Sequence, residues 1–142
     1  VSGDSDPLIV VASTFLEVWD PVTATVRWHG EPTRWQTTRM MITHDMILTG
    51  DAGGNIQATS LDHGVPGWAA DLPGEITGIA ELEVGFAFAS ADGDISVFDN
   101  DGTKIARTTI DVGIADLAAI GPGRLVAAHA APTTGVSELI VE

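Results

Sequence analysis

The sequence contains no cysteine, has few basic residues and lacks any run of about 18 consecutive apolar residues. Without cysteine, a disulfide framework and thiolate chemistry at a metal or a nucleophile are excluded. The missing apolar run excludes a membrane-spanning helix, and no basic segment followed by an apolar stretch marks a secretory signal near the first residue. The composition is that of one globular domain, and it leaves the compartment open.

The charge is strongly one-sided. Six Lys and Arg residues stand against 20 Asp and Glu residues among 142, so the formal net charge is −14. Nucleic-acid backbones and anionic membrane surfaces would be repelled, and neither is expected as a partner. Lys104 is the sole lysine, and this composition resembles that of proteins from extreme halophiles, whose carboxylate surfaces stay hydrated in molar salt. An acidic protein from a mesophile is the alternative, and a fold that loosens at low salt would favour the halophile.

An internal repeat runs through the chain. Segments 15–20, 55–62 and 94–99 each alternate apolar and polar residues and end in an apolar residue followed by Asp. The closing aspartates lie 42 and then 37 residues apart, and segment 136–142 suggests a fourth copy. A period of about forty residues is typical of stacked structural units that each contain a few strands.

Short apolar strands and turn residues recur within each period. The second unit predicts strands at 37–43, 46–50, 55–61 and 65–72, and the third at 76–82, 85–90, 94–98 and 103–112. The first unit begins near residue 8 without an opening strand, and the last has strands at 114–120, 124–129 and 136–141 without a closing one. The units are therefore expected to hold three, four, four and three strands, with no long helix.

This organisation predicts an all-β fold: a β-propeller, or a propeller segment, of about four blades of antiparallel strands with incomplete terminal blades. The blades are expected at about 8–28, 37–72, 76–112 and 114–142, in one domain that follows a tail at 1–7. Incomplete blades leave open strand edges and exposed apolar faces. A partner is implied, either a second copy completing a ring of about eight blades or the remainder of a longer polypeptide, with a closed four-bladed monomer as the third alternative.

Segment 18–28 resembles the PQQ-like (quinoprotein-type) repeat, whose pattern is a small residue, an apolar residue, Asp, then Gly and Trp at spaced positions. Ala24 stands at the glycine position here, and the second unit keeps Gly64. Tryptophan-aspartate repeat propellers are the rival family. The PQQ-like resemblance implies that Trp28 and Trp68 pack against the neighbouring blade.

Neither a cofactor nor an enzyme is expected. The resemblance suggests a PQQ-dependent dehydrogenase, but the chain has few blades, no cysteine and no residues matching the family's cofactor site. The acidic cluster Asp92, Asp94, Asp99 and Asp101 does not have the spacing of a calcium loop and is typical of hairpin turns. The four histidines show no metal-ligand spacing, and no nucleophile-elbow motif is present.

The strongest binding candidates lie on segment 29–36, the longest connection between blades, which carries Arg34 and Trp35. In a propeller these residues share a rim with Asp51, Asp92 and His129, and all five are candidates for partner binding; alternatively, Trp35 packs under its own loop. The sequence thus predicts a non-catalytic protein-interaction or assembly module. An extracellular or virion-surface component binding a glycan or receptor through this rim is the alternative, and a fragment of a propeller enzyme is a remote one.

Overall fold

The computed structural model describes residues 8–111, 113–121, 123–129 and 135–140, of which 129 and 135–140 are described by their backbone only. The secondary structure of these residues is all β, in four antiparallel sheets with three, four, four and three strands, as expected. No helix within this part of the chain could cross a membrane.

Each sheet is built from strands that are consecutive in the chain. Sheet A contains β1 (Ile9–Ala12), β2 (Leu16–Asp20) and β3 (Thr25–His29), and sheet B contains β4 (Thr37–Ile42), β5 (Met46–Asp51), β6 (Asn55–Ser60) and β7 (Pro66–Asp71). Sheet C contains β8 (Ile76–Leu82), β9 (Gly85–Ser90), β10 (Asp94–Phe98) and β11 (Lys104–Thr109). Sheet D contains β12 (Ile114–Gly121), β13 (Arg124–His129) and β14 (Gly135–Ile140).

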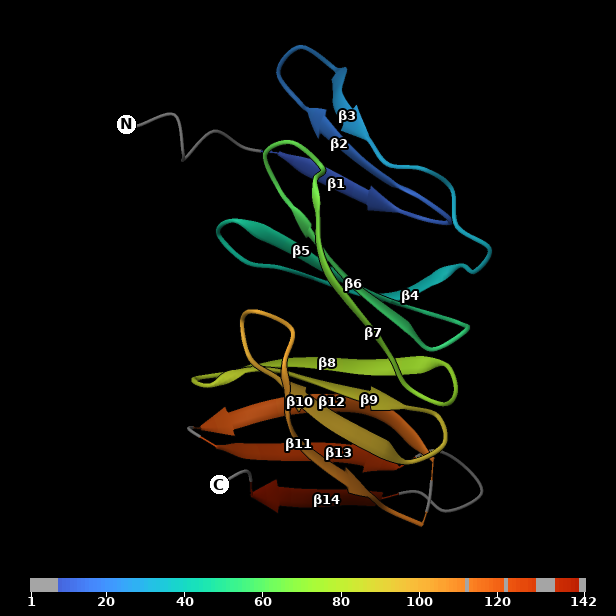
Figure 1. Cartoon of the computed structure of the whole chain (residues 1–142), viewed down its shortest axis with the longest axis vertical. Helices are drawn as coiled ribbons and strands as arrows, with labels where there is room; N and C mark the ends of the chain where they lie inside the picture. Colours follow the sequence, from blue (N-terminus) through green and yellow to red (C-terminus); the bar gives the residue numbers. More distant parts are fainter. Residues whose placement is uncertain (1–7, 112, 122, 130–134, 141–142) are drawn as a thin grey trace.

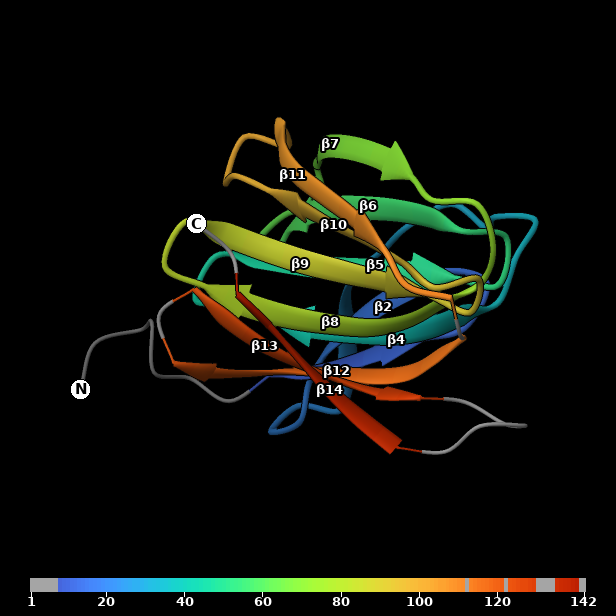
Figure 2. The same ribbon diagram turned by 90° about the horizontal axis from the view of Figure 1, so that it is seen from below.

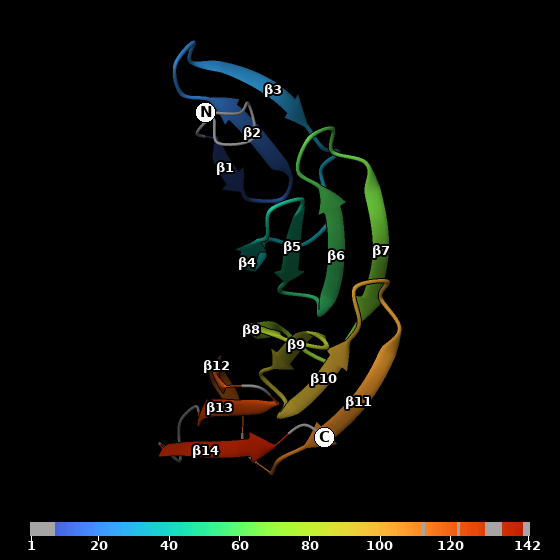
Figure 3. The ribbon, with the colours of Figure 1, turned by 90° about the vertical axis from the view of Figure 1, so that its left-hand side faces the viewer.

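The four sheets follow one another along the molecule, with sheet A at one end and sheet D at the other (Figure 1). Seen from the side, they fan out in an open arc, with β4, β8 and β12 on its concave side and β7 and β11 on its convex side (Figure 3). Neighbouring sheets overlap face to face when viewed along the stack (Figure 2). On the concave side, the Thr38 hydroxyl donates to the carbonyl of Ile76 at 2.5 Å, which joins β4 to β8.

The repeated apolar-Asp ending forms the turn that leads to the outermost strand. The Asp99 carboxylate accepts the backbone N–H groups of Asp101 and Thr103, both at 2.9 Å. The turn also needs a residue of positive φ, which is Gly102 at +86° in sheet C and Gly64 at +71° in sheet B. Ala24, at the glycine position of the repeat, adopts the same left-handed conformation with a φ of +55°.

Sheets B and C enclose a buried aromatic core. The Trp68 ring stacks on Phe98 at a centroid distance of 5.7 Å and meets the edge of Phe88 at 6.4 Å. Its indole N–H donates to the carbonyl of Asn100 at 3.1 Å, in the next sheet. The buried members of this cluster are Leu48, Ile56, Ala58, Leu72, Ile76, Phe86, Phe88 and Phe98.

Sheets C and D share a second buried cluster made of smaller side chains. It contains Ala80, Leu82, Ala87, Ala89, Ile95, Val97, Ile114, Leu117, Leu125 and Ala127. Alternation along β9 separates the two clusters, because the phenylalanines face sheet B and the alanines between them face sheet D. Strand β9 is therefore buried on both faces, as its apolar sequence predicts.

Sheets A and B are joined differently. The described residues form no comparable buried cluster between them, and Trp28 supplies a polar link by donating its indole N–H to the carbonyl of Leu61 at 2.8 Å. Its ring lies against Gly64, where a side chain would collide with it. The connection between the two sheets also returns to sheet A, with the Thr37 N–H donating to the Ser13 carbonyl at 2.8 Å. A crevice remains between the two sheets.

Candidate functional site

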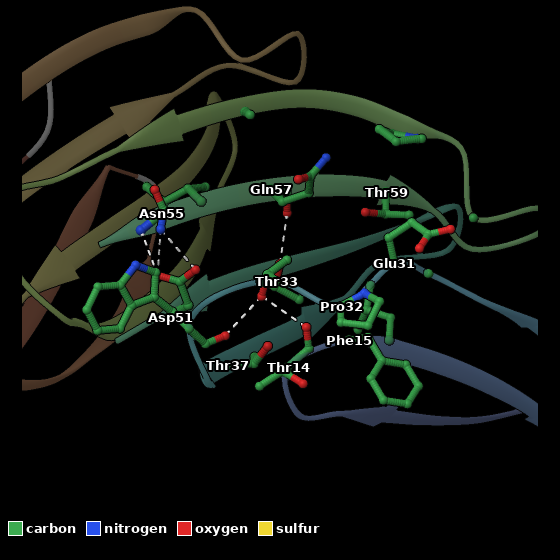
Figure 4. A pocket seen from close by; sticks show the side chains of 18 of the residues that line it. Thr14, Phe15, Glu31, Pro32, Thr33, Thr37, Asp51, Asn55, Gln57 and Thr59 are labelled. Carbon is green, nitrogen blue, oxygen red and sulfur yellow. Dashed lines mark hydrogen bonds between the residues drawn. The ribbon is translucent and has the colours of Figure 1, made fainter. Parts of the chain in front are cut away.

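The crevice between sheets A and B contains a cavity of about 780 Å³ (Figure 4). Its lining comes from both sheets and from the connection between β3 and β4. Sheet A and its turn contribute Thr14, Phe15, Leu16, Trp28 and His29; the connection contributes residues 30–35; and sheet B and its turns contribute Thr37, Thr49, Asp51, Asn55, Ile56, Gln57, Thr59, Gly64, Pro66, Ala69 and Ala70.

The floor of the cavity is a polar face of sheet B. Alternation along β6 turns Ile56 and Ala58 toward sheet C, so that Gln57 and Thr59 face the crevice, and Thr49 lies beside Gln57 on β5. In Figure 4 this floor is at the top of the view, with Gln57 and Thr59 on one side of the cavity and Phe15 and Pro32 on the opposite side. Sequence reasoning missed all three of these polar residues, although the alternation in segments 46–50 and 55–61 could have indicated them.

Two of these floor residues have unsatisfied polar groups. Thr59 is only 6% exposed, yet its hydroxyl makes no hydrogen bond with any described residue. The side-chain amide of Gln57 likewise has no partner within the described part of the chain. Because buried polar groups are normally hydrogen-bonded, the floor has donors and acceptors available for a ligand or for water.

The rim of the cavity is held by the connection between β3 and β4. The Thr33 N–H donates to the Thr14 carbonyl at 2.6 Å, and the Thr33 hydroxyl lies 3.0 Å from the carbonyls of both Thr14 and Trp35. The Arg34 guanidinium lies over the Trp35 ring at 5.2 Å from its centroid. Trp35 packs in turn on Gly53, where any side chain would collide with the indole. The Trp35 ring therefore packs against the β5–β6 turn of sheet B, and the residue is still 40% exposed.

The Asp51 carboxylate lines the cavity but is engaged by its own turn. One oxygen accepts the N–H groups of Gly53 and Asn55, both at 2.9 Å, and the Asn55 amide donates to both oxygens at 3.1 Å. These four contacts close the β5–β6 hairpin. The carboxylate therefore has little capacity left for a bound ligand.

The structure brings together three of the five residues expected to bind a partner. Arg34, Trp35 and Asp51 line the same cavity. Asp92 does not line it and lies on the β9–β10 turn, where its carboxylate approaches Gly74 in the β7–β8 connection. The side chain of His129 lies outside the described residues.

The turns and connections of successive units meet at one rim. The Ala52 N–H donates to the Gln36 carbonyl at 2.9 Å, and the Leu72 N–H donates to the Gly54 carbonyl at 2.8 Å. The Ile110 N–H donates to the Gly93 carbonyl at 2.9 Å in the same manner. Asp51 and Asp92 therefore belong to corresponding turns of neighbouring sheets.

Among the described residues, Asp94 has a pKa that differs from its ordinary value, and it does not line the cavity. The Arg107 guanidinium donates to the Asp94 carboxylate at 2.9 Å and lowers the pKa of that carboxyl, against the effect of burial, which raises it. The Thr109 hydroxyl donates to the same oxygen at 2.9 Å and lowers the pKa further. Within the described residues, no three His, Asp or Glu side chains are placed to hold a common metal ion.

No protein-family model matches the chain, and no curated protein sequence matches it either. The fold is similar to the crystal structure of the computationally designed Ika4 protein, with a TM-score of 0.86, 16% sequence identity, and coverage of 97% of this chain and 88% of Ika4. It is also similar to the computationally designed Ika8 protein, with a TM-score of 0.77, 17% identity, and coverage of 91% of this chain and 41% of Ika8. The chain thus spans less than half of the length of Ika8, and at these identities the likeness concerns the fold alone.

Proposed function

We propose that this chain is a non-catalytic assembly module whose four sheets are successive blades of a β-propeller, built from repeats similar to the PQQ-like repeat. A second copy completes the ring, with sheet A of each copy packed on sheet D of the other. The arc in Figure 3 supports this proposal, because its inner strands line one concave side and its two ends are open.

The observation that carries the proposal is the apolar face of sheet A that points away from sheet B. Ile9 pairs with Trp19 as Phe86 pairs with Phe98 in sheet C. Val11 occupies the position of Phe88 by the same register. These positions of sheet C are buried against a neighbouring sheet, whereas Ile9 is 49% exposed and Val11 is 44% exposed. We call Ile9, Val11 and Trp19 the end face of sheet A.

Sheet D offers a complementary end face. Leu125 and Ala127 point into the cluster shared with sheet C, so Val126 and Ala128 lie on the opposite face. Ala118 pairs with Val126 as Ala80 pairs with Ala87 in sheet C, where both alanines are buried against sheet D. The end face of sheet A thus carries large side chains and that of sheet D small ones. The internal sheets also pack a face of larger side chains against a face of smaller ones.

Ala24 is consistent with this arrangement. In sheets B and C the corresponding glycines, Gly64 and Gly102, have no space for a side chain because Trp28 and Trp68 of the preceding sheet lie on them. The three described strands of sheet D, the last of which corresponds to β10, contain no tryptophan. A methyl group at position 24 is therefore compatible with sheet D of a second copy as the neighbour.

The length of Ika8 also supports a larger assembly. One copy of this chain matches 41% of Ika8, so a protein of this fold can be more than twice as long as the matching segment. Two copies of the chain would approach that length. Because each copy carries a net charge of −14, their association should strengthen in molar salt, which screens the repulsion.

Light scattering behind a size-exclusion column tests the proposal. At about 100 μM protein, well above the micromolar dissociation constants of weak interfaces, and in about 2 M salt, we expect twice the chain mass of 14.8 kDa. Val11→Asp should give a folded species of 14.8 kDa, because it buries a charge in the interface. Val84→Asp adds the same charge at a 51% exposed turn of sheet C and should leave the dimer intact. A folded wild-type monomer, or a dimer indifferent to Val11→Asp, would overturn the proposal.

A further inference from the structure

We propose that the crevice between sheets A and B is a binding site for a neutral, hydroxyl-rich ligand, a mono- or disaccharide. The inference is independent of the assembly, because the end faces of the arc contribute no residue to the crevice. It rests on the volume of the cavity, on the polar side chains of its floor that have no hydrogen-bond partner among the described residues, and on the charged residues around it.

The size of the cavity suits a small ligand. Its volume of about 780 Å³ lies within the range of roughly 300–1,000 Å³ that is typical of small-molecule sites. Apolar and aromatic side chains form its walls, with Phe15 and Trp28 from sheet A and Pro32 and Pro66 on either side. Such walls suit the C–H faces of a sugar ring, while its hydroxyl groups reach a polar floor.

The floor provides the polar contacts. By strand register, Gln57 pairs with Thr49 as Ser96 pairs with Phe88 in sheet C. Ser96 is sealed in the core with no exposed surface, whereas Gln57 lines the cavity and its side-chain amide has no partner among the described residues. An amide offers two donors and an acceptor, which matches the mixed donor and acceptor character of sugar hydroxyls.

Thr59 points to the same ligand class. Thr59 pairs with Ile47 as Phe98 pairs with Phe86 in sheet C, so a hydroxyl side chain stands where sheet C has an aromatic ring. Thr59 is only 6% exposed, yet it lines the cavity. Its hydroxyl is therefore accessible to a ligand hydroxyl, which would satisfy it.

The charges around the cavity favour a neutral ligand. An anionic ligand would meet Glu31 and Asp51 on a protein of net charge −14, and the guanidinium of Arg34 lies over the Trp35 ring at the rim. A cationic ligand would meet the Glu31 carboxylate at the rim but no free carboxylate on the floor, because the oxygens of Asp51 already accept four hydrogen bonds. Hydroxyl and amide groups remain as the contacts that decide binding.

Titration calorimetry and tryptophan fluorescence with glucose, galactose, maltose, cellobiose and lactose test the inference on the full chain. At least one sugar should bind with a dissociation constant of about 1 mM or tighter and change the emission of Trp28. Glucuronate and glucosamine, the anionic and cationic probes, should bind more weakly than glucose. No binding by any of the five neutral sugars, or tighter binding of a charged probe, would overturn the inference.

Two substitutions locate the site. Thr59→Val and Gln57→Leu should each weaken sugar binding about 3- to 10-fold, the loss expected for one neutral hydrogen bond. Neither should lower the melting temperature, because both remove polar groups that lack partners. Thr108→Val, on the exposed face of β11, is the matched control and should leave binding unchanged. Equal affinity in wild type, Thr59→Val and Gln57→Leu would show that the sugar binds elsewhere and overturn the assignment.

Discussion

The interfaces on either side of sheet B are built on the same strand arrangement but have opposite character. Between sheets B and C, aromatic side chains pack together in a buried core. Between sheets A and B, a tryptophan hydrogen bond and a connecting loop hold the sheets around a cavity of about 780 Å³. One repeat therefore supports either a sealed core or an open crevice.

The difference comes from three positions of the repeat. Sheet C presents Phe86, Phe88 and Phe98 to its neighbour. By register, sheet B has Ile47, Thr49 and Thr59 at the corresponding positions. Loss of three aromatic rings removes the volume that would fill the space between the sheets. Strand pairing forms each sheet, and the size of these side chains decides whether the interface between two sheets is filled.

The largest effect on the free energy of unfolding is expected from substitutions of Ile47 and Leu48. These adjacent residues of β5 face opposite interfaces of sheet B. Leu48 belongs to the buried cluster with sheet C, whereas Ile47 pairs with Thr59 on the face toward the crevice, and both are fully buried. Leu48→Ala should lower the free energy of unfolding by about 3–5 kcal/mol, because it leaves a cavity in a sealed core. Ile47→Ala should cost only about 2 kcal/mol, because its void can join the existing cavity.

Chemical denaturation of the two variants measures this difference directly. Wild-type protein and both variants should show similar denaturant slopes, so that the midpoints can be compared. Equal losses for Leu48→Ala and Ile47→Ala would contradict the contrast between the two interfaces.

A smaller effect is expected at Asp94, the buried carboxylate of sheet C that pairs with Arg107. The hydrogen bond from Arg107 lowers the pKa of Asp94 below its ordinary value of 3.8. The stability that the ionised carboxylate contributes is therefore fully present above that value and is lost as the pH falls through the lower pKa of the folded state. Asp94→Asn should cost about 1–3 kcal/mol at neutral pH, because it weakens a charge-assisted hydrogen bond.

The pH dependence distinguishes this contribution from packing. Below about pH 4, wild type should lose stability more steeply than Asp94→Asn, and their unfolding free energies should converge. Parallel curves for the two proteins down to pH 2 would rule out the ionised carboxylate as the source of the stability.

The smallest effect is expected at Ala24, in the turn of sheet A. A left-handed conformation disfavours alanine, and its two counterparts in sheets B and C are glycine. Ala24→Gly should raise the free energy of unfolding by about 0.5 kcal/mol, after the greater freedom of glycine in the unfolded chain is subtracted. Ala52→Gly is the control, since Ala52 lies in a turn without positive φ, and it should lower stability. A melting temperature that falls in both variants would contradict the strain at Ala24.

The strands could be predicted from the sequence, and the crevice could not. Alternation and Asp-Gly turns are local signals, which is why segments 76–82, 85–90 and 94–98 match β8, β9 and β10 at both ends. The grouping of Arg34, Trp35 and Asp51 followed from the expected rim. Thr59 and Gln57 were missed because their role depends on what the neighbouring sheet places opposite them. The partner of Asp94 was missed because Arg107 reaches it only through the β10–β11 register.

The strictly sequential pairing of the strands has a consequence for folding. Because each sheet contains only neighbours along the chain, the described part of the molecule behaves as a nearly one-dimensional array, whose stability is the sum of its sheets and their interfaces. The interface between sheets A and B is the weakest of the array, so sheet A can open while sheets B, C and D remain folded. Native-state hydrogen exchange should accordingly find the amides of β2 less protected than those of β9 and β10, and a saccharide in the crevice should slow their exchange.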